Sequence, residues 1–206
     1  MRKHTFLLAA SVIIGISAAA QTGKQKQPLH IVPEPVSATV QEGSFLLKPG
    51  TRIVASDPAA SGVASLLAAM LQAPTGYHLP TVTREGKYPG HTIALNINAR
   101  PDAALGDEGY TLQVLPAQVV IAANKPQGLF YGIQTLMQLL PPAIGSHSTV
   151  KDTPWEMPCV SITDYPRFGW RGLMLDVSRH FFSKAFVKQY IDEMVKYKFN
   201  VFHWHL

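Results

Sequence analysis

Apolar residues recur along the chain with two spacings, one typical of helices and one typical of strands. Two segments repeat apolar residues at i, i+3, i+4 and i+7, which is the spacing of an amphipathic helix. The first follows Asp57-Pro58, a pair placed to cap and open it, and the second begins near Pro126 and ends at Pro141-Pro142. The predicted apolar faces are Val63, Leu66, Leu67, Met70 and Leu71 in the first helix, and Leu129, Ile133, Leu136, Met137 and Leu140 in the second.

Shorter apolar or alternating runs between turn residues predict strands. These runs cover residues 36–40, 44–47, 51–55, 92–97, 110–115 and 119–122. Glu42-Gly43 is a predicted turn between the first two strands, and the last two strands form a predicted hairpin. Residues 28–150 are therefore expected to form one α+β domain, with helices packed on a mostly antiparallel sheet. Gly128 and Gly132 either let the second helix approach that sheet closely or are tolerated at up to about 1 kcal/mol each.

The last forty or so residues follow a different pattern. Residues 172–177 form a nearly continuous apolar strand, of the kind that is buried on both faces in a parallel sheet. Ser183 is placed to cap a following amphipathic helix, Lys196 and Lys198 suit the C-terminal end of that helix, and Asn200 is its expected C-cap. Residues 201–206 form a second apolar strand. The sequence thus predicts a βαβ unit, joined to the preceding domain by a linker over residues 151–164.

The N-terminal residues belong to another kind of segment. A basic start at Arg2-Lys3 precedes an apolar stretch over residues 6–16, and small residues follow up to Ala20. This pattern predicts a secretory signal peptide over residues 1–20, followed by a flexible leader over residues 21–27. The apolar stretch is shorter than the roughly 20 residues of a membrane span. The sequence therefore predicts an exported protein, periplasmic or extracellular, without a membrane span.

Charge and cysteine content exclude several kinds of protein. The 206 residues include 18 basic and 13 acidic side chains, a formal net charge of +5. The charges are scattered and no Lys/Arg run is longer than two, so no nucleic-acid partner is expected. Cys159 is the single cysteine, which excludes an intrachain disulfide and a cysteine-based zinc site, and it is expected to be a buried free thiol. The oligomeric state is not predicted.

Three motifs of the C-terminal region carry a family resemblance. They are YPRF at 165–168, WRGLMLDVSRHFF at 170–182 and NVFHWHL at 200–206. They resemble the start of the catalytic barrel of family 20 glycoside hydrolases, the β-N-acetylhexosaminidases. Residues 31–35 and 128–139 are similar to parts of the accessory N-terminal domain of that family. The resemblance implies an accessory α+β domain followed, over residues 165–206, by the truncated start of a (β/α)8 TIM barrel, since a complete barrel needs about 250 residues.

The resemblance also implies a reaction. Family 20 enzymes hydrolyse terminal non-reducing β-linked GlcNAc or GalNAc with retention, and the 2-acetamido oxygen of the substrate is the nucleophile. The implied partners are N-acetylhexosamine-terminated oligosaccharides or glycans, and no metal or organic cofactor is implied. An adjacent Asp-Glu pair on a later strand supplies the catalytic carboxyls. Asp107-Glu108 and Asp192-Glu193 are expected to be solvated charges, so the catalytic pair is expected downstream of Leu206 and this fragment alone is expected to be inactive.

Three residues are candidate substrate contacts. The resemblance assigns Arg179 to the hydroxyls of the terminal sugar, which suits the planar set of donors on a guanidinium. Asp176 either orients groups of the site or is a buried structural anchor. His205 is expected near the site, and His203 lies on the same strand face. Arg171 opens the strand at the opposite, stability-related end.

Three other functions are compatible with parts of this sequence. The histidine pair His203 and His205 resembles the metal-binding strand of amidohydrolase barrels, but a zinc site needs at least three protein ligands and in those barrels the motif lies on the first strand. A different exported glycosidase with the same accessory domain is one alternative. A non-catalytic carbohydrate-associated module is another, although such a module would end near residue 150.

Overall fold

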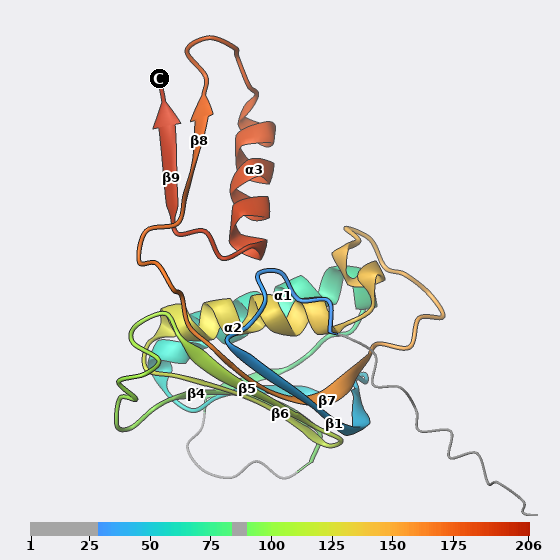
Figure 1. Cartoon of the computed structure of the whole chain (residues 1–206). Coiled ribbons are helices and arrows are strands. Elements are labelled where there is room, and N and C mark those ends of the chain that lie inside the picture. Colours follow the sequence, from blue (N-terminus) through green and yellow to red (C-terminus); the bar gives the residue numbers. More distant parts are fainter. Residues whose placement is uncertain (1–28, 84–89) are drawn as a thin grey trace, which may run out of the picture.

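The structure is a computed structural model that describes residues 29–83 and 90–206. The signal peptide predicted over residues 1–20 and the leader over residues 21–27 lie outside the described residues. Within the described part of the chain, no helix combines the length and the apolar character needed to cross a membrane. The chain forms a sheet domain, followed by a separate strand–helix–strand unit at its C-terminal end (Figure 1).

Seven strands form the sheet of the sheet domain, in the order β1-β7-β5-β6-β4-β2-β3. From β1 to β6 the neighbours are antiparallel, and from β6 to β3 they are parallel. The prediction of a mostly antiparallel sheet is therefore wrong, because three of the six neighbouring pairs are parallel. Helix α1 connects β2 to β3 as a crossover, which places them side by side in the same direction. The strands are β1 (Ser37–Leu46), β2 (Arg52–Ala55), β3 (Thr81–Thr83), β4 (Thr92–Ile97), β5 (Tyr110–Leu115), β6 (Gln118–Ala123) and β7 (Glu156–Asp164).

Strand β1 is one long strand where the sequence pattern predicted two strands and a turn. Its pairing with β7 shifts register between Val40 and Ser44. Gly43, inside this shift, has a φ of 96°, a conformation that glycine adopts without a steric penalty. The predicted turn at Glu42-Gly43 is thus a bulge, and β7 pairs with the strand on both sides of it.

Strand β7 occupies most of the linker predicted over residues 151–164. It pairs with β1 on one side and with β5 on the other, so it lies inside the sheet. Val160 and Ile162 are buried while Ser161 is exposed, which is a strand pattern that the sequence analysis overlooked. The domain predicted to end at residue 150 therefore continues through Asp164. Cys159 is a buried free thiol on this strand, as predicted.

Two helices lie on one face of the sheet, α1 (Ser61–Thr75) and α2 (Pro126–Leu139) (Figure 1). Asp57 caps the 3-10 turn that leads into α1, since its carboxylate accepts a hydrogen bond from the Ala59 amide at 2.7 Å. The buried residues of α1 include Leu67 and Leu71, as predicted, but Leu66 is 41% exposed. Leu66 lies about 100° around the helix from Leu67, which turns it out of the contact with the sheet. The two 3-10 turns of the domain are Pro58–Ala60 and Pro142–Gly145.

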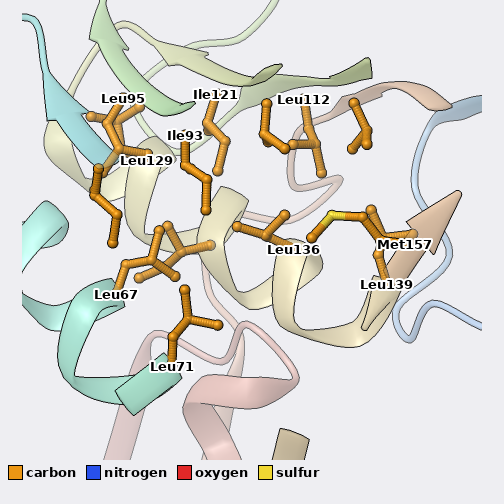
Figure 2. Close-up of a cluster of buried hydrophobic side chains, with 14 of the residues drawn as sticks. Leu67, Leu71, Ile93, Leu95, Leu112, Ile121, Leu129, Leu136, Leu139 and Met157 are labelled. Carbon is orange, nitrogen blue, oxygen red and sulfur yellow. The ribbon is translucent and has the colours of Figure 1, made fainter. Parts of the chain in front are cut away.

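The core lies between these helices and the sheet. Leu129, Ile133 and Leu136 of α2 are fully buried, as their spacing predicts. Their side chains meet leucines and isoleucines of the sheet and of α1 (Figure 2). The view also labels Leu139 of α2 and, from the other elements, Leu67, Leu71, Ile93, Leu95, Leu112, Ile121 and Met157.

Gly128 and Gly132 allow α2 to lie directly against the sheet, which decides between the two interpretations left open by the sequence. A Cβ atom on Gly132 would lie 2.5 Å from Cγ2 of Ile121. A Cβ atom on Gly128 would lie 2.7 Å from Cβ of Ala123 and would also overlap the Gly109 carbonyl oxygen. Both distances are shorter than any normal van der Waals contact, so only glycine fits at these two positions.

The C-terminal βαβ unit agrees with its prediction. Strands β8 (Gly172–Asp176) and β9 (Val201–His205) are parallel neighbours, connected by α3 (Lys184–Lys196). The predicted cap is confirmed, since Ser183 Oγ accepts a hydrogen bond from the Phe186 amide at 3.2 Å. The C-terminal end differs from the prediction, because Tyr197 and not Asn200 is the C-cap, and Lys198 after it has a left-handed φ of 61°.

Replacing the cap residue by alanine should loosen the first turn of α3. Ser183→Ala removes the acceptor for one amide of that turn, and we expect a loss of about 1 kcal/mol in the stability of the unit. Amide hydrogen exchange across residues 184–188 measures this loss. Ser183→Asp is the matched control, because aspartate caps a helix as well as serine does and should keep the exchange rates at the wild-type level. Equal rates in all three proteins would contradict the prediction.

Candidate functional site

Asp176 and His205 lie side by side at the carboxyl ends of two neighbouring strands. They are register partners, because Asp176 ends β8 opposite His205 at the end of β9. Both strands point away from the sheet domain, so these ends lie on the side of the unit that is turned away from that domain (Figure 1). Two of the three candidate residues are therefore brought together by strand pairing alone.

Asp176 anchors the loop that follows β8. One of its carboxylate oxygens, Oδ1, accepts hydrogen bonds from the amides of Ser178 at 3.0 Å and Arg179 at 3.2 Å. The other oxygen, Oδ2, lies 3.6 Å from Nε of Arg179. The Asp176 carboxylate thus contacts both the backbone of the loop and Nε of the Arg179 side chain. Asp176 therefore restricts the orientation of Arg179.

The third candidate, Arg179, is a solvent-exposed cation at this edge. Its side chain is 83% exposed, although it forms an ion pair with Asp176. An exposed pair of this kind contributes about 1 kcal/mol or less to stability. The pair therefore leaves the guanidinium free to meet a ligand while restricting where it points.

The polar residues of the unit share one face of its two strands. Helix α3 packs on the other face, where the Tyr190 ring lies 5.8 Å from the Phe202 ring and Leu175 is buried. Because side chains alternate along a strand, Asp176, His203 and His205 point away from α3. The ring centroids of His203 and His205 are 6.4 Å apart. Residues able to bind or protonate a ligand thus gather on the face without the helix.

Among the described residues, this histidine pair does not belong to a group of side chains that could hold a metal ion. Across residues 29–83 and 90–206, no three His, Cys, Asp or Glu side chains are grouped so that they could hold a metal ion. Two imidazoles alone fall short of the three protein ligands of a catalytic zinc site.

At the opposite end of the strands, a buried lysine joins the unit to the sheet domain. Lys198 Nζ donates hydrogen bonds to Asp164 Oδ2 at 2.7 Å and to the Tyr110 hydroxyl at 2.9 Å. The Tyr110 hydroxyl also donates to Asp164 at 3.0 Å and shares a 2.5 Å hydrogen bond with Thr135. Burial lowers the pKa of Lys198, and Asp164 partly offsets that shift. Burial, and then the Asp164 charge, raise the pKa of Tyr110.

A second ion pair crosses the same junction. Arg171 Nη1 lies 2.9 Å from Glu108 Oε2, and Arg171 Nε donates to the Lys198 carbonyl at 2.8 Å. The Asn200 side chain accepts from the Arg171 amide and donates to Glu108. The prediction that Glu108 is a solvated charge is therefore wrong, because the folded chain brings Arg171 to it from 63 residues away. Its neighbour Asp107 is an exposed charge, as predicted, and pairs with Lys125 on the surface.

A cavity of about 270 Å³ lies at this junction. Its walls come from both parts of the chain, with Tyr131 and Glu108 on the sheet domain and Phe168 and Arg171 beside β8. The charged groups Arg171 and Lys198 in its wall are already paired, with Glu108 and Asp164 respectively. This junction was not predicted from the sequence, because Lys198 and Arg171 find their partners Asp164 and Glu108 in segments 34 and 63 residues away.

Two models of glycoside hydrolase domains match this chain. The first, described as "Glycosyl hydrolase family 20, domain 2", matches residues 29–165, and the second, "Glycosyl hydrolase family 20, catalytic domain", matches residues 168–206. The sheet domain thus matches domain 2 of this family, and the βαβ unit matches a part of its catalytic domain. The chain belongs to glycosyl hydrolase family 20, as its C-terminal motifs indicated.

Several named proteins resemble the chain. A beta-hexosaminidase of Porphyromonas gingivalis is 36% identical over 212 aligned positions, which cover 100% of this chain and 27% of that protein. A beta-N-acetylhexosaminidase of Cellulomonas fimi is 33% identical over 178 positions, which cover 85% of this chain and 34% of that protein. The chain therefore spans about a quarter to a third of the length of these relatives.

Solved structures show the same relation. The family 20 beta-N-acetylhexosaminidase of Streptomyces coelicolor superposes with a TM-score of 0.78 at 41% identity, over 87% of this chain and 35% of that one. A mutant Streptomyces plicatus beta-hexosaminidase in complex with its product GlcNAc superposes with a TM-score of 0.77 at 43% identity, with the same coverage.

Proposed function

We propose that the protein containing this chain is an exported β-N-acetylhexosaminidase. It removes terminal non-reducing β-linked GlcNAc or GalNAc with retention of the anomeric configuration. The 2-acetamido group of the substrate acts as the nucleophile. The observation that carries this proposal is the match of residues 168–206 to the family 20 catalytic domain, whose named relatives are beta-hexosaminidases. One neighbour in structure holds GlcNAc as its product.

The βαβ unit is, in this proposal, the start of a (β/α)8 barrel. In such barrels the helices lie outside, the opposite strand face points inward, and the active site lies at the carboxyl ends of the strands. The arrangement of β8, α3 and β9 supports this assignment, since the strands are parallel and α3 covers one face only. Asp176, Arg179 and His205 then lie at the active-site end of the barrel.

Each of these residues has a proposed role in binding the sugar. Arg179 donates hydrogen bonds to hydroxyls of the terminal sugar, because its guanidinium is exposed and presents several donors. Asp176 orients Arg179 through the contacts it makes to the loop. His205 provides a further hydrogen-bonding group beside Asp176. The acid and the carboxylate that orients the acetamido group are an Asp-Glu pair on a later strand, and no metal or organic cofactor takes part.

The proposal is tested with the full-length protein and chromogenic β-GlcNAc and β-GalNAc substrates. We expect Arg179→Ala to lower kcat/KM about 30-fold, mainly through a higher KM, because a charged hydrogen bond contributes about 2 kcal/mol. Arg100→Ala is the control, since Arg100 is exposed on the sheet domain and should leave kcat/KM unchanged. A wild-type protein that hydrolyses neither substrate would refute the function. An unchanged kcat/KM in Arg179→Ala would refute only the role of Arg179.

A further inference from the structure

We infer that Glu108 and Asp164 of the sheet domain are positioning residues for the proposed sugar site. They hold the starting ends of β8 and β9, and thereby fix where Asp176 and His205 stand at the other ends. The inference rests on the proposed function for its kinetic consequence and on the described contacts for its geometry.

The contact to β9 runs through Lys198, three residues before that strand begins. The side chains of Lys198 and Asp164 are only 8% and 12% exposed, so their 2.7 Å ion pair is largely shielded from water. The left-handed φ of 61° at Lys198 ends α3 and turns the chain toward β9. One buried carboxylate of the sheet domain therefore fixes the point at which the chain enters β9.

The contact to β8 runs through Arg171, which directly precedes that strand. The Glu108 carboxylate accepts hydrogen bonds from the Arg171 guanidinium at 2.9 Å and from the side-chain amide of Asn200 at 3.1 Å. Asn200 directly precedes β9. The backbone N–H groups of Asn200 and Val201 both donate to the Arg171 carbonyl. Glu108 thus holds the residues in front of both strands at once, and these residues are also bonded to each other.

Strand geometry carries this fixation to the candidate site. Asp176 is five residues beyond Arg171, and His205 is five residues beyond Asn200. At about 3.3 Å per residue, both candidates lie roughly 16 Å from the fixed ends, along straight hydrogen-bonded strands. The contacts through Arg171 and Lys198 fix the position and the direction of this strand pair relative to the sheet domain. If these contacts were lost, the carboxyl ends of both strands would move together.

The cavity beside the junction supports the same interpretation. Four of its charged wall residues are paired across the boundary between the two parts of the chain, Arg171 with Glu108 and Lys198 with Asp164, so these four charges already have partners. The carboxyl-terminal side of α3 is held as well, since the Gln138 side chain of α2 donates to the Lys196 carbonyl at 3.2 Å. All of these contacts are at the starting ends of the strands, and Asp176, Arg179 and His205 are at the other ends.

The structural test is hydrogen exchange in the full-length protein carrying Asp164→Asn and Glu108→Gln together. We expect amide exchange in residues 172–176 and 201–205 to accelerate at least about tenfold, while β4 and β6 keep their wild-type rates. Asp107→Asn is the matched control, because Asp107 is adjacent to Glu108 but forms only an exposed ion pair with Lys125. Wild-type exchange rates in both strands of the double variant would overturn the inference.

The kinetic test separates positioning from mere stability. In the single variant Glu108→Gln, assayed well below its Tm, we expect KM for the chromogenic sugar to rise about tenfold while kcat falls less. A purely structural role would lower Tm and leave KM of the folded enzyme unchanged, and that result would overturn the inference. If the wild-type protein shows no hexosaminidase activity, the proposed function fails, and the exchange experiment still decides whether these carboxylates hold the strands.

Discussion

Replacing Lys198 by methionine should lower the free energy of unfolding by about 3–5 kcal/mol. Methionine keeps most of the volume of the lysine stem, so the expected loss comes from the charge that remains behind. Asp164 is buried, and without the ammonium group its carboxylate keeps, among the contacts of the described residues, the Tyr110 hydroxyl at 3.0 Å and the Val36 amide at 3.4 Å as donors. Removing one partner of a buried ion pair leaves an uncompensated charge in a medium of low polarity.

Chemical denaturation of the wild type and four variants measures this effect. Lys196→Met is the matched control, because Lys196 lies two residues away and forms an exposed i, i+3 pair with Glu193, which should cost less than about 1 kcal/mol. Asp164→Asn alone and in combination with Lys198→Met completes a double-mutant cycle. The double variant should be more stable than Lys198→Met, because no charge is then left unpaired. A loss below 1 kcal/mol in Lys198→Met would show that the pair is not important for stability.

The sequence was sufficient for elements whose signals are local. The bounds of β4 and β5 agree with the predicted residues 92–97 and 110–115, because turn residues flank each alternating run. The cap of α3 at Ser183 also depends only on neighbouring residues. The pairing of strands could not be predicted in this way, since Ser37 of β1 meets Thr163 of β7 across more than 120 residues. That pairing turns an expected linker into an inner strand of the sheet.

The candidate site likewise has one part that the sequence predicts and one part that it does not. Asp176 and His205 could be predicted to lie close together, because the ends of consecutive parallel strands meet at one edge. The junction could not be predicted, since a lysine at the end of a helix is usually a solvated charge that interacts with the helix dipole. The left-handed backbone at Lys198 turns this residue toward Asp164 instead. Only the folded chain shows that this charge is buried.

Replacing Gly128 by alanine should destabilise the sheet domain by about 3 kcal/mol. The added methyl group would overlap the Gly109 carbonyl and lie 2.7 Å from Cβ of Ala123, and neither group can rotate away as a flexible side chain could. Helix α2 would then have to move off the sheet, which separates Leu129 and Ile133 from their contacts in the core. Thermal and chemical unfolding measure the loss.

The matched control for this substitution is Gly62→Ala in α1. No atom lies within 4 Å of a Cβ at Gly62, so alanine should stabilise that helix by up to about 1 kcal/mol through its higher helix propensity. The same glycine-to-alanine change is thus expected to have opposite signs in the two helices, because only α2 needs glycine for its contact with the sheet. A Gly128→Ala variant as stable as the wild type would contradict the close approach of α2 to the sheet.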